Sequence, residues 1–159
     1  MRVSLIGKGR MSQAVQRLAV QGGHEVIRVL GRDDNPPERP FGGQWVEASE
    51  AMIDFSLAEA VESNLEKALQ AELPLVIGVT GWYDRLPEIE AEIDRARGTV
   101  LYASNFSLGM QVLFHLSRQA ARIFSSFQEY DPFLWEAHHR HKADAPSGTA
   151  LSLRDILAE

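Results

Sequence analysis

A polar segment near the C-terminal end of the chain gathers most of its chemically reactive side chains. Residues 136–149 read EAHHRHKADAPSGT and hold three of the five histidines, one lysine and two acids. An imidazole can give or take a proton near neutral pH, and an ammonium group supplies fixed positive charge beside a developing anion. Proton transfer next to an anion is therefore the chemistry that this segment favours.

The end of this segment predicts the start of a helix that can hold an anion. Pro146-Ser-Gly-Thr149 precedes apolar residues at helical spacing, so Ser147 is expected to cap the helix rather than to contact a ligand. Free N–H groups and the positive dipole end of a helix attract a carboxylate. The two acids, Glu136 and Asp144, are expected to orient neighbouring groups rather than to react.

Two other interpretations of the segment stay open. One is a solvated polar loop in which the histidines have no shared role. The other is a zinc site formed by His138, His139 and His141, although the chain has no cysteine and Lys142 beside the ligands would repel a cation. We expect no metal.

The composition excludes several classes of protein. The chain has 159 residues, a formal net charge of -6 and no cysteine. An acidic chain lacks the basic face that nucleic acid requires, and without cysteine there are no disulfides or thiolate metal sites. No apolar run approaches the ~20 residues that span a membrane. We therefore expect a cytoplasmic protein with no nucleic-acid or membrane partner.

The first residues predict the opening of a dinucleotide-binding βαβ unit. A short apolar run over 3–6 is followed at once by Gly7-Lys-Gly-Arg-Met11 and by apolar residues at helical spacing up to Gly22. A strand, a glycine turn and a helix in this order typically hold a pyrophosphate at the helix start. Gly7 would allow the tight turn, and Gly9 the close approach of the backbone. A simple strand-to-helix turn is the alternative.

The residues after the second predicted strand bear on the choice of cofactor. The strand covers 24–30 and is followed by Gly31 and Arg32. Folds that select NAD place an acid at the strand end for the ribose hydroxyls, whereas an arginine accommodates a 2'-phosphate. We therefore expect NADPH to bind at least as well as NADH. An ordinary surface arginine is the alternative.

The rest of the chain alternates predicted strands and helices. A loop is expected over 34–43, strands over 51–55, 75–81 and 99–103, and helices over 58–69, 86–96 and from Ser107 onward. Short links between alternating elements imply a parallel sheet with right-handed crossovers. The fold class is therefore α/β, a doubly wound parallel sheet of the Rossmann type. Such sheets bind ligands at the carboxyl ends of their strands.

Several of these segments resemble the dihydrodipicolinate reductase (4-hydroxy-tetrahydrodipicolinate reductase) family. The family signature, approximately E-x-H-H-x-x-K-x-D-x-P-S-G-T-A, matches residues 136–150 throughout. Shorter family motifs match at Gly9-Arg-Met11, Asp54-Phe-Ser56 and Asn105-Phe-Ser107. The chain departs from the family at the first glycine turn, where one residue is missing and Ser12 replaces a glycine. It also has Val79 in place of the first threonine of a G-T-T-G motif.

The resemblance implies a reductase that transfers a hydride from NADPH and/or NADH to 4-hydroxy-tetrahydrodipicolinate, a cyclic dicarboxylate of lysine and diaminopimelate biosynthesis. It implies that His138 gives and takes a proton and that Lys142 supplies positive charge or a proton. His139, Gly148 and Thr149 would bind the substrate. The implied cofactor-binding residues are Gly7, Lys8, Gly9, Arg10, Met11, Arg32, Gly78, Val79, Thr80, Ala103, Ser104, Asn105 and Phe106.

The resemblance also implies two domains. Residues 1–127 would bind the dinucleotide, and residues 128–159 would begin a smaller α+β domain for substrate binding and oligomer formation. That domain continues for several more strands in the family, so we expect a fragment whose single strand near 131–137 has no partner. It should fold and bind reduced cofactor with very low turnover, and its loop from His138 to Thr149 should be mobile or ordered by a neighbouring molecule. The full-length protein is expected to be a homotetramer.

Two other functions stay open. The chain could be a different Rossmann-type oxidoreductase that uses NAD(P), or a nicotinamide-nucleotide-sensing domain that has lost turnover. Oxidation of reduced cofactor only in the presence of the coupled synthase's product would distinguish the reductase from both.

Overall fold

The structure is a computed structural model that describes residues 1–140 and 145–158. The chain divides into two compact units, Met1–Ala103 and Ser104–Glu159, and each is described by itself. The division falls before the long helix α5 (Leu108–Phe124), whereas the sequence places a boundary after it, near residue 127. The assignment of residues 1–127 and 128–159 to two functional domains stays a prediction.

The first unit is built on a parallel sheet of five strands. In sequence order they are β1 (Arg2–Ile6), β2 (Glu25–Leu30), β3 (Ala51–Asp54), β4 (Leu75–Ile77) and β5 (Val100–Tyr102). Their order across the sheet is β2-β1-β3-β4-β5, and every neighbouring pair is parallel. The predicted α/β class with a doubly wound parallel sheet is confirmed.

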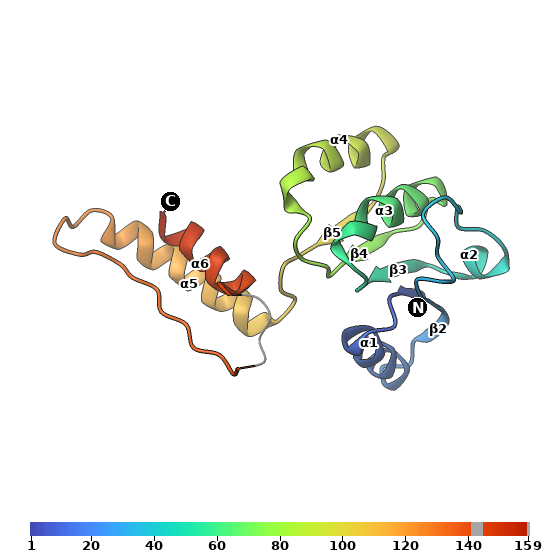
Figure 1. The fold of residues 1–159 in the computed structure, drawn as a ribbon, viewed down its shortest axis with the longest axis horizontal. Coiled ribbons are helices and arrows are strands. Elements are labelled where there is room, and N and C mark those ends of the chain that lie inside the picture. Colours follow the sequence, from blue (N-terminus) through green and yellow to red (C-terminus); the bar gives the residue numbers. More distant parts are fainter. Residues whose placement is uncertain (141–144, 159) are drawn as a thin grey trace. The chain divides into compact units, whose positions relative to one another are not determined.

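The helices of this unit connect the strands. They are α1 (Arg10–Gln21), α2 (Gln44–Ala48), α3 (Val61–Gln70) and α4 (Leu86–Ala96), with short 3-10 turns at Ala58–Ala60 and Tyr83–Arg85. Figure 1 shows α1 on one side of the sheet and α3 and α4 on the other. Right-handed crossovers produce this arrangement, because the chain moves from β1 to β2 in one direction and from β3 to β4 and β5 in the other.

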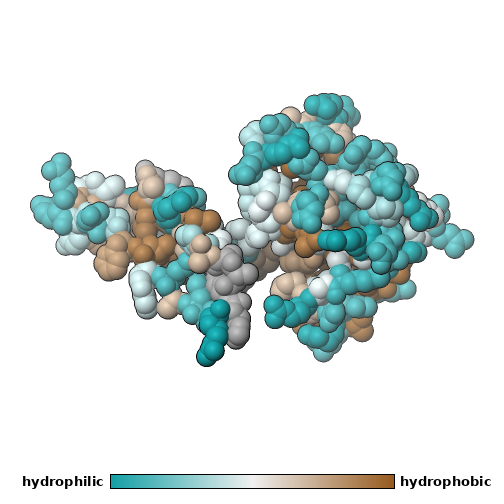
Figure 2. All heavy atoms as spheres, in the orientation of Figure 1, coloured by the Kyte–Doolittle hydropathy of each residue, from teal (hydrophilic) through white to brown (hydrophobic). Residues whose placement is uncertain are grey.

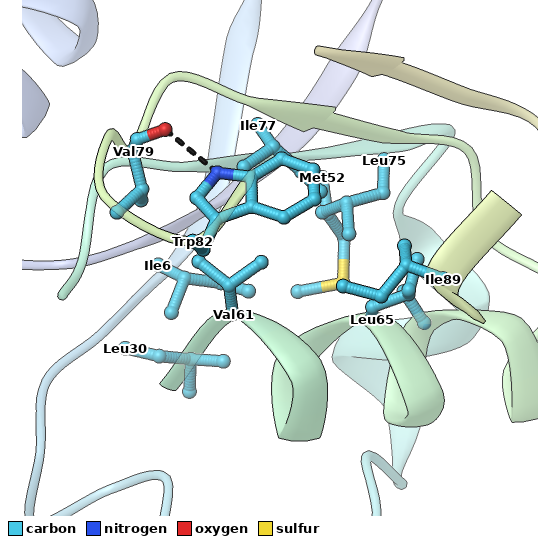
Figure 3. Packing of buried hydrophobic residues seen from close by; sticks show 11 residues of the cluster. Ile6, Leu30, Met52, Val61, Leu65, Leu75, Ile77, Val79, Trp82 and Ile89 are labelled. Atoms are coloured by element: carbon cyan, nitrogen blue, oxygen red, sulfur yellow. Dashed lines mark hydrogen bonds between the residues drawn. The ribbon is translucent and has the colours of Figure 1, made fainter. Parts of the chain in front are cut away.

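The main core of the first unit lies between the sheet and α3. Val61, Leu65 and Ala68 recur at helical spacing on the buried face of α3. Trp82 packs in the same core, and its indole N–H donates to the carbonyl oxygen of Val79 at 2.8 Å, which satisfies the one polar atom of the ring. Figure 3 shows this ring among the other members of the cluster, Ile6, Leu30, Met52, Leu75, Ile77 and Ile89.

The short helix α2 is missing from the sequence-based prediction. It has five residues and follows directly after the expected loop over 34–43, which forms neither helix nor strand. Five residues are too few for apolar periodicity to distinguish a helix from a loop. The strand β4 is also shorter than the predicted 75–81, because the chain leaves the sheet at Gly78.

The second unit contains α5 and α6 (Gly148–Ala158), which pack against each other. Residues 131–137, where an unpaired strand was expected, form no ladder and are not assigned as a strand. Figure 2 shows apolar surface on this unit, where the large exposed side chains include Leu108, Leu116, Phe133 and Trp135. Within the described residues, no helix combines the length and the apolar character needed to cross a membrane.

The buried hydroxyl of Ser12 gives a test of packing around α1. Ser12 is 2% exposed, and its Oγ has no hydrogen-bond partner among the described residues. A buried unpaired hydroxyl costs about 1–3 kcal/mol, so Ser12→Ala should raise the free energy of unfolding by about 1 kcal/mol. Urea denaturation measures the change.

Ser4→Ala is the matched control for this variant. Ser4 is equally buried, but its Oγ lies 2.7 Å from that of Ser49 and makes a hydrogen bond with it. Removing a satisfied hydroxyl should lower the free energy of unfolding. A loss of stability in Ser12→Ala as large as that in Ser4→Ala would contradict the unpaired state of Ser12.

Candidate active site

A cleft opens in the first unit at the carboxyl ends of β1, β2 and β3. The strand order reverses at β1, because β2 lies on one side of it and β3 on the other, and open α/β sheets bind ligands at such a switch point. The cleft has a volume of about 510 Å³. Of the predicted cofactor-binding residues, Gly7, Lys8, Gly9 and Arg32 line it. The lining also includes Gly31, Asn35, Pro37, Phe55, Ser56, Ser63 and Asn64.

The two glycines of the first turn meet different constraints. Gly7 has φ +105°, and a Cβ there would lie 2.5 Å from the carbonyl oxygen of Phe55, so only glycine fits. Gly9 is the N-cap of α1 and has no side chain to cap it, and a Cβ there would meet no atom of the described residues within 4 Å. Gly9 therefore faces open space at a helix start whose first amides lack intrahelical acceptors. This arrangement fits the phosphates of a dinucleotide.

A carboxylate lies beside the end of β2 although residue 31 is glycine. Asp34 Oδ2 accepts hydrogen bonds from Lys8 Nζ at 2.6 Å and from the Gly31 N–H at 3.0 Å. The hydrogen bond from Lys8, together with that from the Gly31 amide, holds the pKa of Asp34 below its usual value. An NAD-selective fold has an acid at the end of this strand. Here the turn brings Asp34, three residues after Gly31, close to that position.

Arg32 lies at the rim of the same cleft. Its guanidinium is 3.9 Å from Glu59 Oε1, and both side chains are largely exposed. Exposed ion pairs of this kind contribute little to stability, so a phosphate can replace the carboxylate as the partner of the arginine at low cost. The charge of Arg32 is therefore available to a ligand.

The residues that follow β4 do not line the cleft but support one of its walls. Gly78 packs beneath Phe55, since a Cβ at Gly78 would lie 2.1 Å from the Phe55 ring. Val79, the residue in place of the family threonine, is buried in the core and its carbonyl is bonded to Trp82. Thr80 is exposed. The predicted contacts of these three residues with a cofactor stay predictions.

Six further predicted cofactor-binding residues also lie outside the lining of the cleft. Arg10 and Met11 are exposed in the first turn of α1, and Ala103 is the last residue of the first unit. In the second unit, Asn105 Oδ1 accepts a hydrogen bond from the Ser107 N–H at 2.8 Å and so shapes the turn before α5. The remaining two, Ser104 and Phe106, are exposed.

In the second unit, Glu136 joins the histidine segment to the start of α6. Its Oε2 accepts hydrogen bonds from His138 Nε2 and from the Ser147 hydroxyl, both at 2.7 Å, and its Oε1 accepts one from the Ser147 N–H at 2.9 Å. The Ser147 hydroxyl in turn accepts the Ala150 N–H at 3.0 Å, which confirms Ser147 as the helix cap. One carboxylate therefore orients both His138 and the helix start, as expected for Glu136.

The charge of Glu136 determines which His138 nitrogen carries a proton. The hydrogen bond from His138, followed by those from the Ser147 side chain and backbone, lowers the pKa of Glu136 to about 2. An ionised carboxylate can only accept, so His138 Nε2 must be the donor. Nδ1 is then the nitrogen that can gain or release a proton while the contact with Glu136 persists.

The other predicted residues of this segment differ in what the structure describes. His139 is exposed, and Gly148 and Thr149 form the first turn of α6, where backbone N–H groups have no intrahelical acceptor. Lys142 lies outside the described residues, as do His141 and Asp144, so the proposed roles of these side chains stay predictions.

Sequence reasoning missed a set of polar residues on α3 that support the cleft. Ser63, Asn64 and Lys67 lie on one side of the helix and bond to the loop that follows β2. The available signal was their spacing, because Ser63 and Asn64 precede Lys67 by four and three positions, and residues so spaced are neighbours on a helix surface. The apolar residues of the same helix predicted only that it packs against the core.

The contrast between Gly7 and Gly9 predicts effects of very different size for the same substitution. Gly7→Ala should lower the free energy of unfolding by about 1–3 kcal/mol, because alanine is strained at positive φ and its Cβ meets Phe55. Gly9→Ala should change it by less than about 0.5 kcal/mol, since its backbone is extended and its surroundings are open. Urea denaturation of both variants measures this, and equal losses would contradict the geometry of the turn.

Acid should weaken the contacts of Glu136. Its folded pKa of about 2 lies below the ordinary value of 4.5, so the ionised carboxylate stabilises the folded chain above pH 4.5 and the contribution is lost as the pH falls toward 2. The stability difference between the parent chain and Glu136→Gln should therefore shrink across this range. Urea denaturation at a series of pH values measures it.

The control for this titration is Glu129→Gln, which alters an exposed carboxylate of the same unit. Both variants are measured over the same pH range, so that any effect common to removing a carboxylate from this unit can be subtracted. If the Glu136→Gln difference stays constant between pH 4.5 and 2, the hydrogen bonds of Glu136 do not depend on its charge.

The sequence matches two family descriptions that together cover nearly the whole chain. Residues 1–106 match "Dihydrodipicolinate reductase, N-terminus" and residues 109–159 match "Dihydrodipicolinate reductase, C-terminus". The 4-hydroxy-tetrahydrodipicolinate reductase of Christiangramia forsetii is 31% identical over all of this chain and 64% of its own length. The enzyme of the same name from Zymomonas mobilis is 38% identical over 99% of this chain and 62% of its own. The chain thus spans less than two thirds of these relatives.

A solved structure has the same fold. It is described as "Dipicolinate bound Dihydrodipicolinate reductase from Paenisporosarcina sp. TG-14" and aligns with a TM-score of 0.67 at 21% identity, over 99% of this chain and 65% of that chain. At this identity the similarity shows the fold alone. The two family matches, which begin at residue 1 and extend to residue 159, show that the chain belongs to the dihydrodipicolinate reductase family.

Proposed function

We propose that this chain carries the chemistry of a reductase that transfers a hydride from NAD(P)H to 4-hydroxy-tetrahydrodipicolinate in lysine and diaminopimelate biosynthesis. The observation that carries the proposal is the position of the Glu136 carboxylate, which holds His138 and the start of α6 together. A proton carrier and an anion-binding helix start are thereby joined in one small unit. A cyclic dicarboxylate whose ring is reduced needs both.

Reductases of this family use a nicotinamide cofactor. The open space over Gly9, the uncapped start of α1 and the cleft at the switch point fit its phosphates. Arg32 and Lys8 would hold a 2'-phosphate, so NADPH should bind at least as well as NADH. Asp34 beside Gly31 offers an acceptor for the ribose hydroxyls of NADH. Both cofactors are therefore proposed.

Different residues would transfer the proton and bind the carboxylate of the substrate. When bound, a reduced nicotinamide supplies a hydride to the electrophilic ring carbon. His138 releases a proton from Nδ1 to the neighbouring atom that gains charge, and Glu136 stabilises the charged form of the ring at Nε2. The N–H groups of Gly148 and Thr149 hold a substrate carboxylate at the start of α6. The roles of His139 and Lys142 are carried over from the family signature.

The relatives support this choice of substrate. The relatives from Christiangramia forsetii and Zymomonas mobilis are both named for 4-hydroxy-tetrahydrodipicolinate, a cyclic dicarboxylate. A homotetramer for the full-length protein stays a proposal.

A single-turnover experiment tests the function. The chain, in excess over NADPH, is mixed with substrate made in situ by the coupled synthase, and cofactor oxidation is followed by absorbance. Oxidation should depend on the synthase product. His138→Gln should slow it by about 10²–10⁴-fold, because proton transfer is lost, while cofactor affinity stays unchanged. Equal rates in the parent chain and the variant would remove His138 from the mechanism.

A further inference from the structure

A buried lysine of α3 holds the loop that follows β2. Lys67 is 4% exposed, and its Nζ donates to the Asn35 side-chain oxygen at 2.8 Å and to the Pro36 carbonyl oxygen at 2.7 Å. The same ammonium group lies 5.5 Å from the centre of the Phe41 ring. An ammonium group removed from water is costly unless it is paired in this way. Its contacts therefore fix the loop at both the side chain and the backbone.

A chain of amides connects this lysine to a buried acid at the end of β3. Asn35 Nδ2 donates to Asn64 Oδ1 at 2.7 Å, and Asn64 Nδ2 donates to Asp54 Oδ2 at 2.8 Å. Lysine can only donate, and both oxygens of Asp54 accept N–H groups, the second from Ser56 at 2.7 Å. The two charged ends therefore impose one direction on both amides, and neither asparagine can flip without losing two bonds.

The hydrogen bonds that connect Lys67 through Asn35 and Asn64 to Asp54 reach the wall of the cleft. Asn35, Ser56 and Asn64 all line it, and Arg32 precedes Asn35 by three residues on the same loop. Ser63 adds a bond from its hydroxyl to the Pro37 carbonyl oxygen at 3.2 Å. Three consecutive loop residues, 35–37, are thus tied to one face of α3. Arg32 is carried on a loop whose path is set by that face.

The buried charges have no evident benefit for stability. Burial raises the pKa of Asp54 and lowers that of Lys67 from their ordinary values, so each charged form is penalised. Buried ionic groups are often replaceable by apolar ones without loss of stability. Their value here lies in setting the geometry of the loop.

We propose that Lys67 is a positioning residue for cofactor choice, which holds the loop of Arg32 ready for the 2'-phosphate of NADPH. The inference rests on the proposed nicotinamide-binding function and assigns a specificity role to a residue that does not line the cleft. Because the loop is set before binding, Arg32 loses little freedom when the phosphate arrives. NADH lacks that phosphate and should depend much less on Lys67.

The test is a double-mutant cycle on the 159-residue chain. Dissociation constants for NADPH and NADH are measured by calorimetry for the parent, Lys67→Met, Arg32→Ala and the double variant. Lys67→Met should weaken NADPH by about 3- to 10-fold, the cost of ordering one or two side chains on binding, and NADH by less than about 2-fold. In the Arg32→Ala background the NADPH effect should disappear, because Lys67 acts through Arg32.

Two further variants separate positioning from general stability. Asn35→Ala breaks the same link outside the core and should reproduce the Lys67→Met pattern, also if Lys67→Met does not fold. Ser49→Ala removes a buried hydrogen bond to Ser4, away from the cleft, and should lower stability with no change in either dissociation constant. A matching loss of NADPH affinity in Ser49→Ala would overturn the proposal.

The remaining outcomes distinguish this inference from the function on which it rests. If the parent chain binds NADPH and neither Lys67→Met nor Asn35→Ala changes the ratio of the two dissociation constants, the role of Lys67 is wrong and the cofactor site stands. The same holds if the effect of Lys67→Met persists undiminished without Arg32. If the parent chain binds neither nucleotide, the cofactor site itself is wrong, and the role of Lys67 with it.

Discussion

The close packing of Phe55 between two glycines underlies the arrangement of the first unit. On one side the Phe55 carbonyl oxygen would be 2.5 Å from a Cβ at Gly7, and on the other its ring would be 2.1 Å from one at Gly78. Such contacts leave no room for any side chain. The ends of β1, β3 and β4 can therefore meet at this separation only because both residues are glycine. This part of the wall of the cleft is therefore packed directly against the ends of the strands.

The helix α3 links the core to the cleft because its two sides have different contacts. Its apolar side packs Val61, Leu65 and Ala68 against the sheet, and its polar side binds the loop after β2 through Ser63, Asn64 and Lys67. A rigid element held by core packing can position groups that a loop alone could not. The same 3.6-residue repeat thus serves stability on one side and ligand geometry on the other.

A single carboxylate has a comparable role in the second unit. Glu136 occupies the place that a glutamate of the helix itself takes in a capping box, since it accepts the N–H of the cap residue Ser147. It comes from eleven positions upstream and brings His138 with it. Hydrogen bonds to an ionised group are stronger than neutral ones, so this link can orient an otherwise exposed imidazole.

Patterns among residues close in sequence were sufficient to predict much of the secondary structure of this protein. Apolar runs of strand length, glycine turns and helical periodicity predicted all five strands and the α/β class, and the spacing before Ala150 identified Ser147 as the cap. These features depend on residues close in sequence, where backbone geometry and side-chain period act directly. The same patterns could not decide the structure of 131–137, because a strand is defined by a ladder with a partner that a local pattern does not contain.

Tertiary structure alone decided which residues share the cleft and which support it. In the folded chain Val79 is buried in the core, and Asp34 accepts a hydrogen bond from the Gly31 N–H. Hydrogen bonds also connect α3 to the loop after β2 and to the end of β3, over more than thirty positions of sequence. The residues that make them are Lys67, Asn35, Asn64 and Asp54. A hydrogen bond between distant residues is satisfied only after the sheet has brought their elements together. The amino-acid types of the site could therefore be read from the chain, while their partners, charges and proton positions followed only from the fold.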